Sequence, residues 1–501
     1  MDQAIPDPPG LPPKRGLLHS GPVSIPLRIL VVLLIGLSFV ISVPAAESIS
    51  LNLRKAKPNI ILIIADDMAW DDCGAYGHPS LPTPNIDRIA SEGIRFGRAF
   101  LTTSSCSPSR ASIITSRYPH STGAEQLHWP LPQGQVTWVD WLRRSGYYTV
   151  AAGKWHLGPH AKQSFNRVYE ARGRTNPSGC AEWLRALRAV PKGKPYFLWL
   201  ASFDPHRAYK EGIIPTPTPP GDVVLPPYIP DTLEVRKDYA RYYDEVRRLD
   251  SYVGSIMSEL DERKEADNTF ILFMSDNGRP FPRDKTTVYD SGIRTPFVMR
   301  WPGKIAPGGT SSSLVSSIDI GPTLLEVAGV RGKPSGVQGT SFMPILKDPG
   351  AEIREYIFAE RNWHDFDAYG RAVRDGRFKY IRNYYFDKPL TPPADAVGSP
   401  TFQEIRRLRE AKMIPKSKMV YFQTPRPYEE LYDLEADPHE MNNLAKRSVH
   451  LSTMRRLRAV LDEWRASTED KMPKTRTADE FDRNTGESLP TRVWPRVPPA
   501  R

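Results

Sequence analysis

The strongest constraint on the fold of this chain is a series of short, almost wholly apolar segments. They lie at 59–65, 148–152, 196–203, 270–274 and 297–300. Segments with the periodicity of helices lie between them, at 85–92, 136–144 and 235–260. Strands that are apolar on both faces and alternate with helices form a mostly parallel sheet that helices cover on both sides. The sequence therefore predicts an α/β fold.

The last third of the chain has a different pattern. Short alternating segments at 378–381 and 430–433 predict antiparallel strands, and a polar helix is expected at about 450–467. We expect 58–350 to form the larger domain and 351–467 a smaller α+β domain. The charged, proline-containing tail at 468–501 is expected to be poorly ordered.

The N-terminus has the pattern of an export signal. Lys14, Arg15 and Arg28 precede an apolar run at 29–43, and Ala45-Ala46 follow it. The run is shorter than the roughly 20 residues of a membrane span and fits the apolar region of a signal peptide. We expect a signal peptide at 1–46, a linker at 47–57, and an exported protein (periplasmic, extracellular or lumenal) without stable membrane insertion. An uncleaved anchor is the alternative.

Charge and cysteine content narrow the classes of partner. The formal net charge is +11, but no Lys/Arg stripe interleaved with aromatic residues is present, so we expect no nucleic acid. The charge is either spread over a solvated surface or attracts a polyanionic substrate. The three cysteines, Cys73, Cys106 and Cys180, form no disulfide framework. Cys73 and Cys180 either pair or remain free thiols.

Polar side chains follow four of the predicted strands. In open α/β sheets, ligands bind beyond the carboxyl ends of the strands, so these side chains are expected at one rim. Four of them, from the ends of the first and fourth strands, offer hard oxygen ligands that suit Ca²⁺ or Mg²⁺ better than zinc. Alternatively, each carboxylate caps the helix or turn that follows it. The four segments are Asp66-Asp67, Gly153-Lys154-Trp155-His156, Asp204-Pro205-His206 and Ser275-Asp276-Asn277-Gly278.

Cys106 stands before a predicted helix. Ser107 is a good N-cap and Pro108 a good first helical residue, which places Cys106 just ahead of the helix N-terminus. Free backbone N–H groups and the helix dipole favour an anion there, and Arg110 adds a fixed positive charge. A sulfate or phosphate group would fit. The alternative is a buried structural cysteine before a capped helix.

The stretch Cys106-Ser107-Pro108-Ser109-Arg110 resembles the C-x-P-S-R signature of the type I, formylglycine-dependent sulfatases. The four strand-end segments resemble sulfatase elements in the order of that family, and the likeness covers roughly 58–444. Within the family, 280–282 and 399–403 are most similar to the heparan N-sulfatases, also called sulfamidases or N-sulfoglucosamine sulfohydrolases. The resemblance implies the alkaline-phosphatase-like sulfatase fold, with 58–350 as the catalytic domain.

The resemblance also implies a mechanism. A formylglycine-generating enzyme would oxidise Cys106 to formylglycine during maturation, and one Ca²⁺ would assist the attack on a sulfated saccharide, of the N-sulfoglucosamine type. His128 and His364 are candidates for binding the sugar. The implied Ca²⁺ ligands are Asp66, Asp67, Cys106, Asp276 and Asn277; the implied catalytic residues are Cys106, Arg110, Lys154, His156, His206 and Lys285.

Three other functions stay open. Lys285 stands where sulfamidases carry Arg and most O-sulfatases carry Lys, which favours an O-sulfatase acting on another sulfated polysaccharide. A formylglycine-dependent phosphonate monoester hydrolase would share the same site. An inactive protein that binds sulfated glycans would require an unmodified Cys106. The sequence does not fix the oligomeric state.

Overall fold

A computed structural model describes residues 57–171, 176–415 and 418–497. From Lys57 on, these residues belong to one compact unit. The expected signal peptide and nearly all of the expected linker lie outside the described residues. Among the helices in the described ranges, none combines the length and apolarity that a membrane crossing needs.

The main sheet has eight strands in the order β5-β4-β6-β1-β7-β8-β2-β9. The pairs from β5 to β7 are parallel, β8 runs antiparallel to both of its neighbours, and β9 pairs parallel to β2. The α/β prediction is confirmed, although three short strands had no apolar run to reveal them. The strands are β1 (Asn59–Ala65), β2 (Ile94–Phe96), β4 (Tyr148–Gly153), β5 (Arg167–Glu170), β6 (Tyr196–Ala201), β7 (Thr269–Ser275), β8 (Phe297–Arg300) and β9 (Gly309–Ser311).

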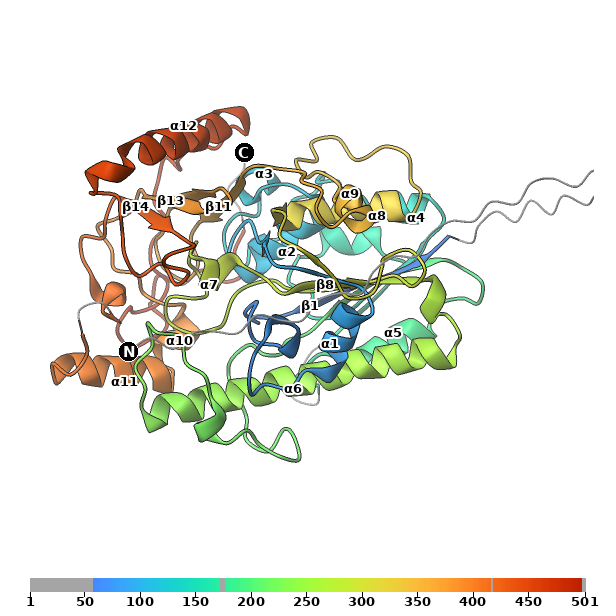
Figure 1. Cartoon of the computed structure of the whole chain (residues 1–501), viewed down its shortest axis with the longest axis horizontal. Coiled ribbons are helices and arrows are strands. Elements are labelled where there is room, and N and C mark those ends of the chain that lie inside the picture. The colour runs from blue at the N-terminus through green and yellow to red at the C-terminus, as the bar shows by residue number, and fades with distance from the viewer. Residues whose placement is uncertain (1–56, 172–175, 416–417, 498–501) are drawn as a thin grey trace, which may run out of the picture. The chain divides into compact units, whose positions relative to one another are not determined.

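Two layers of helices cover this sheet, one on each face (Figure 1). Every residue of β1 is buried, and its alternate side chains enter two separate cores. The core that contains Ile61 and Ile63 lies under α1 (Pro84–Ser91), α5 (Glu182–Arg188) and α6 (Leu233–Glu262). The core that contains Leu62 lies under α2 (Cys106–Thr115), α4 (Trp138–Arg144) and α8 (Ile320–Val327).

A second sheet follows in the chain. It is an antiparallel sheet of four strands in sequence order, β11 (Ile357–Arg361), β12 (Gly370–Arg374), β13 (Phe378–Asn383) and β14 (Glu429–Asp433). Helix α12 (Leu451–Ser467) packs Leu457, Leu461 and Trp464 against Val373 and Tyr380 of this sheet. The short remaining elements are β3 (Ala99–Phe100), β10 (Val315–Ser316), α3 (Pro119–Thr122), α7 (Asp290–Ile293), α9 (Met343–Lys347), α10 (Ala394–Val397) and α11 (Pro400–Glu410).

The C-terminal segment differs from the expected poorly ordered tail. The structure describes it as far as residue 497 and shows it hydrogen-bonded to residues much earlier in the chain. The Asp470 carboxylate accepts two hydrogen bonds from the buried Arg371, and the Trp363 indole donates to the carbonyl of Ala478. The charged composition suggested a solvated chain, but several of these charges have buried partners.

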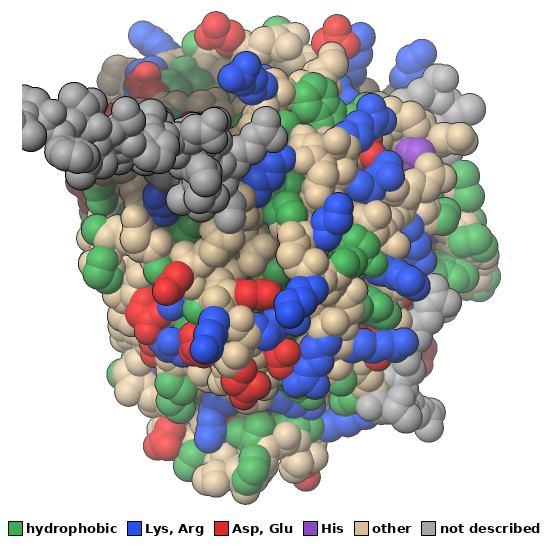
Figure 2. Space-filling model, turned by 90° about the vertical axis from the view of Figure 1, so that its right-hand side faces the viewer, with side chains coloured by type: hydrophobic (Ala, Val, Ile, Leu, Met, Phe, Trp, Pro, Cys, Tyr) green, Lys and Arg blue, Asp and Glu red, His purple; other side chains and the backbone are tan. Residues whose placement is uncertain are grey.

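One face of the molecule shows how the net positive charge is distributed (Figure 2). In its lower half, basic side chains lie directly beside acidic ones. On this face, part of the positive charge is therefore compensated locally.

Candidate active site

The acidic groups of the site follow two neighbouring parallel strands. Ala65 of β1 lies opposite Ser275 of β7, so the next residues of both strands lie side by side. The Asp67 N–H donates to the Asp276 carboxylate at 3.3 Å, and the Asn277 amide nitrogen lies 3.1 Å from the Asp67 carboxylate. The side chains of Asp66, Asp67, Asp276 and Asn277 are all fully buried.

The cations of the site come from three other segments. Gly153 ends β4 at a φ of 92°, and a Cβ there would lie 1.8 Å from the Ala201 carbonyl, so this turn requires glycine. The next residue, Lys154, pairs with Asp66. Arg110 on α2 donates to Asp276 at 2.7 Å, and Lys285 lies 2.7 Å from Asp67.

Helix α2 begins two residues earlier than the sequence indicated. Its N-cap is Ser105, with extended backbone, and Cys106 is its first residue. The prediction of Ser107 as N-cap and Pro108 as first helical residue is therefore wrong. Pro108 instead occupies the third position of the helix, where its missing N–H breaks no intrahelical bond. The Ser107 hydroxyl accepts a hydrogen bond from the backbone of His128 at 2.8 Å.

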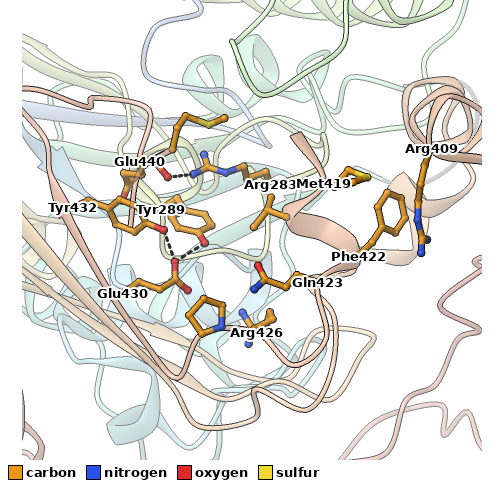
Figure 3. A pocket seen from close by; sticks show the side chains of 13 residues that line it. Arg283, Tyr289, Arg409, Met419, Phe422, Gln423, Arg426, Glu430, Tyr432 and Glu440 are labelled. Carbon is orange, nitrogen blue, oxygen red and sulfur yellow. Dashed lines mark hydrogen bonds between the residues drawn. The ribbon is translucent and has the colours of Figure 1, made fainter. Parts of the chain in front are cut away.

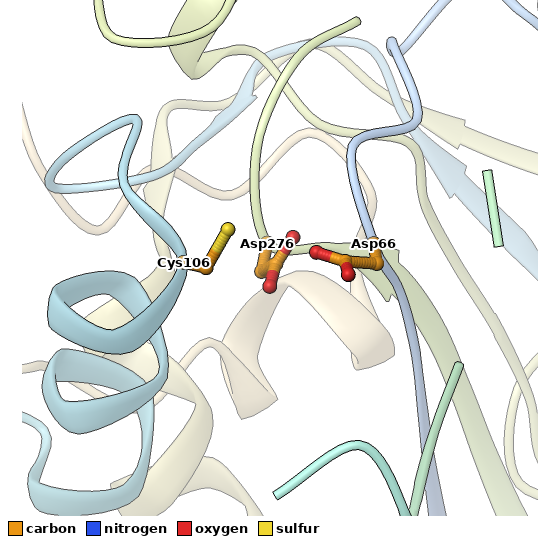
Figure 4. Close-up of side chains that lie close together, drawn as sticks. All are labelled: Asp66, Cys106 and Asp276. Atoms are coloured by element: carbon orange, nitrogen blue, oxygen red, sulfur yellow. The ribbon is translucent and has the colours of Figure 1, made fainter. Parts of the chain in front are cut away.

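Cys106 faces the acidic groups directly. Its Sγ lies 3.3 Å from the Asn277 amide nitrogen and 3.9 Å from the Asp67 carboxylate. Figure 4 shows the side chains of Cys106, Asp276 and Asp66 pointing toward one another. One ligand atom from each of these three lies within 4.8 Å of the others.

The donor set fits a hard divalent cation. The Asp66 Oδ1 and Asn277 Oδ1 atoms are buried and have no hydrogen-bond partner. A buried acceptor without a partner costs roughly 1–3 kcal/mol, and a cation held by these oxygens would remove that cost. Three carboxylates and an amide oxygen are ligands of the Ca²⁺ or Mg²⁺ type.

Two histidines are held as a pair beside Cys106. The His128 Nδ1 and His156 Nε2 atoms lie 2.7 Å apart, and the His156 Nδ1 is buried without a partner. Both residues have left-handed backbone, with φ of 67° and 57°, and Asp67 has a φ of 72°. Such strained residues persist where the surrounding structure holds them in place, commonly at functional sites. Burial lowers the pKa of His128 to about 4, which keeps its ring neutral.

His206 and Lys285 reach the site from its more open side. The His206 Nε2 lies 3.8 Å from the Asp67 carboxylate and 3.5 Å from that of Asp395. Asp395, on α10, also lies 4.0 Å from the Lys285 ammonium. Sequence reasoning missed Asp395, because it belongs to no strand-end motif. The available signal was its place just before the sulfamidase-like segment at 399–403.

His364 contacts the residue that precedes Cys106. Its Nδ1 is 2.7 Å from the Ser105 hydroxyl, its side chain is 6% exposed, and Asp365 lies beside it. An imidazole in this place can position the backbone that precedes Cys106. The structure brings the other candidate for sugar binding, His128, to the rim.

Burial and the paired charges have opposite effects on the pKa values of the site. Burial raises the pKa of the Cys106 thiol well above its usual range and the pKa of Asp276 to about 6. Burial also acts to raise the pKa of Asp66, but Lys154, His206 and Arg110 outweigh it and hold that pKa below its usual range. Cys73 and Cys180 are free, buried thiols.

A cavity of about 480 Å³ lies elsewhere in the molecule and includes none of the predicted site residues (Figure 3). Arg283, Arg426 and Tyr289 line it. The Glu430 carboxylate inside it accepts hydrogen bonds from the hydroxyls of Tyr289 and Tyr432. At the candidate active site, the side chains of Asp395 and His206 are 30% and 29% exposed.

Two family models match the chain. The sulfatase model matches residues 58–330, and the model of the C-terminal part of N-sulphoglucosamine sulphohydrolases matches 281–391. The chain belongs to the sulfatase family. This membership confirms the resemblance seen at Cys106 and makes the protein an enzyme of the sulfatase type.

Individual relatives of this sulfatase support the same conclusion. It is 31% identical to an ulvan-active sulfatase of Formosa agariphila, over 81% of this chain and 74% of the relative. It is 30% identical to the human N-sulphoglucosamine sulphohydrolase, over 84% of this chain and 92% of the relative. The solved structure of a 2-O GAG sulfatase superposes with a TM-score of 0.65 at 23% identity, covering 84% and 95% of the two chains, and shows the shared fold.

Proposed function

We propose that this sulfatase releases inorganic sulfate from an N-sulfoglucosamine-type sugar, through a formylglycine made from Cys106 and with one bound Ca²⁺. The observation that carries the proposal is the position of Cys106. It begins a helix and faces a group of buried oxygen ligands, two of which have no hydrogen-bond partner. Arg110, Lys154 and Lys285 pair with the carboxylates of this group. The protein would be exported through its N-terminal signal.

Each partner group would supply one kind of chemistry. Bound Ca²⁺ would polarise the sulfate oxygens, and the hydrated formylglycine would supply a hydroxyl for attack on sulfur. Arg110 and Lys154 offset the negative charge that gathers around residue 106, since both are buried and fixed by carboxylates. Asp66, Asp67, Asp276 and Asn277 would hold the cation.

The remaining residues would bind sulfate and move protons. His206 and Lys285 both lie near the Asp67 Oδ2 atom, where they would contact the sulfate and protonate the leaving nitrogen. His156 has a buried Nδ1 without a partner and would accept the proton of the second hydroxyl when sulfate is expelled. His128, bonded to the other ring nitrogen, would keep the His156 ring in its orientation.

The N-sulfated substrate rests on two findings. The C-terminal family model of N-sulphoglucosamine sulphohydrolases matches 281–391, which contains Lys285 and His364. The human enzyme of that name matches along 92% of its length. An O-sulfatase is the second candidate, favoured by Lys285 and by the similarity to ulvan-active sulfatases.

The test is a comparison of two sugars. The protein is co-expressed with a formylglycine-generating enzyme and supplied with Ca²⁺, and conversion of Cys106 is measured by mass spectrometry. Free sulfate is then measured from N-sulfoglucosamine and from glucosamine 6-O-sulfate.

We expect sulfate release from the first sugar. Release only from the second would make the protein an O-sulfatase. Release from neither, with Cys106 converted, would overturn the substrate class and direct the search to phosphonates. An intact Cys106 thiol in protein from the native host would overturn the enzymatic mechanism.

A further inference from the structure

The C-terminal segment at 489–497 borders the candidate active site. The ring of Trp494 lies 5.0 Å from that of His128, with the ring planes at 83°. His128 in turn contacts His156, and its backbone donates to the hydroxyl of Ser107, the neighbour of Cys106. Only one side chain therefore separates Trp494 from the histidine assigned to the last proton transfer.

Buried contacts fix the position of this segment. The Arg496 guanidinium lies 3.5 Å from the centre of the Trp363 ring and donates to the Gln126 side chain at 2.9 Å. Its side chain is only 7% exposed. On the other side of Trp494, the Leu489 N–H donates to the Glu480 carbonyl at 2.8 Å. Trp494 is thus held from both directions.

Two side chains of this anchored segment, those of Trp494 and Arg492, are exposed. The Arg492 guanidinium also lies 4.9 Å from the centre of the Phe481 ring. Trp494 is 62% exposed. The Arg492 guanidinium lies 5.8 Å from the centre of the Trp494 ring and donates to the Ser488 hydroxyl at 3.0 Å. In the described parts of the chain, no carboxylate lies within 4.0 Å of Arg492. An exposed ring and a guanidinium that has no carboxylate partner among the described residues therefore lie together at the rim of the site.

We propose that Trp494 and Arg492 form a binding subsite for the sugar next to the one that loses its sulfate. The face of an indole packs well against a sugar ring, and a guanidinium binds a sulfate or carboxylate group with two parallel hydrogen bonds. This subsite rests on the proposed function, because it requires an anionic saccharide as substrate. It makes the enzyme prefer chains of two or more sugars over a single sugar.

The test compares two lengths of substrate. kcat/KM is measured on N-sulfoglucosamine and on a heparan sulfate tetrasaccharide with N-sulfoglucosamine at its non-reducing end. Trp494→Ala and Arg492→Gln should each lower the ratio of tetrasaccharide to monosaccharide kcat/KM by roughly tenfold. Val493→Ala is the matched control, since Val493 is a neighbour of similar exposure (60%) without a ring or charge, and should leave the ratio unchanged. An equal loss on both sugars in the Trp494 variant would overturn the subsite and assign Trp494 to positioning His128.

A binding measurement separates this inference from the proposed function. The tetrasaccharide is titrated calorimetrically into the Cys106→Ala variant, with and without Trp494→Ala. A roughly tenfold weaker Kd in the double variant supports the subsite even if the wild-type protein releases no sulfate from either sugar. An unchanged Kd would overturn the subsite even if the wild-type protein is an active sulfamidase.

Discussion

Two regions of this sulfatase bury charged side chains. In one region several buried polar atoms lack a hydrogen-bond partner, and in the other the buried carboxylate has several. At the strand ends, Asp66, Asn277 and His156 keep buried polar atoms without a partner. In the second region, between the four-stranded sheet and the C-terminal segment, Arg371 donates to both oxygens of Asp470 and also to Asn362 and a carbonyl. Arg465 and Tyr369 complete the bonding of that carboxylate. Buried charge alone therefore does not mark a functional site. The strand-end region differs from the second region because several of its buried polar atoms have no hydrogen-bond partner.

The sharpest test of this contrast is removal of the nucleophile. Cys106→Ala should lower turnover by roughly 10⁴-fold or more, because the reacting group is lost. The free energy of unfolding should change by only about 1 kcal/mol, since the substitution removes a single sulfur atom. Sulfate release and urea unfolding measure the two effects. Cys180→Ala, which removes another buried free thiol, is the control and should keep its turnover. Full activity in the Cys106 variant would refute the proposed mechanism.

Removal of the divalent cation should have the next largest effect. Chelation should lower turnover by about 100-fold or more, and added Ca²⁺ should restore it. Ca²⁺ at 100 times its Kd should also raise the free energy of unfolding by about 2.7 kcal/mol, which thermal melting detects independently of activity. Asp66→Asn should abolish this shift in melting temperature. A melting temperature that responds to neither chelator nor Ca²⁺ would rule out a cation at the unpaired oxygens.

Mutation in the second region, around Arg371 and Asp470, should lower the stability of the protein. Arg371→Ala leaves the Asp470 carboxylate without its main partner and should lower the free energy of unfolding by about 3–5 kcal/mol. The matched control is Arg456→Ala, which removes a guanidinium that is 42% exposed from its pair with Asp375 and should cost less than about 1 kcal/mol. Denaturant unfolding measures both. If the Arg371 variant were as stable as the wild type, the contrast between the regions would fail.

The smallest expected effect is a change in how the free energy of unfolding depends on pH. Burial raises the pKa of Asp284 to about 7, even though Arg279 and Arg283 act against it. The folded protein therefore holds this proton more tightly than the unfolded chain. The resulting stability is complete below pH 4 and is lost as the pH rises through 7. The free energy of unfolding of the wild type should fall between pH 5 and pH 8. In the Asp284→Asn variant, this fall should be smaller by about 2 kcal/mol. Parallel pH profiles of the urea midpoints would contradict this assignment.

The sequence predicted those features that depend on local pattern. The runs at 59–65 and 297–300 became β1 and β8 with the expected ends, because strands buried on both faces must be apolar throughout. The rim of polar residues followed from the parallel order of the strands. The start of α2 was wrong by two residues, since Ser105 and Ser107 are equally good N-caps and only the fold decides between them.

Other features depend on partners far away in the chain. Asp395 joins the site because α10 lies beside Lys285 in the folded molecule. The sulfamidase-like segment at 399–403 pointed to this part of the chain, but it did not identify the contact. The tail was predicted to be solvated because the sequence does not show which distant residues bind its arginines and carboxylates. Trp494 lies against His128 only in the folded molecule.

The residues of the site are far apart in the chain, so the ribosome makes them at different times. Cys106 is only 2% exposed in the folded molecule, so an enzyme that modifies it must act earlier. The carboxylate of Asp395, which helps to complete the site, is made 289 residues later (395 − 106). At about 5–20 residues per second, a ribosome needs roughly 15 to 60 s for that stretch. Translation therefore leaves at least this much time for the proposed conversion of Cys106 before Asp395 can join the site.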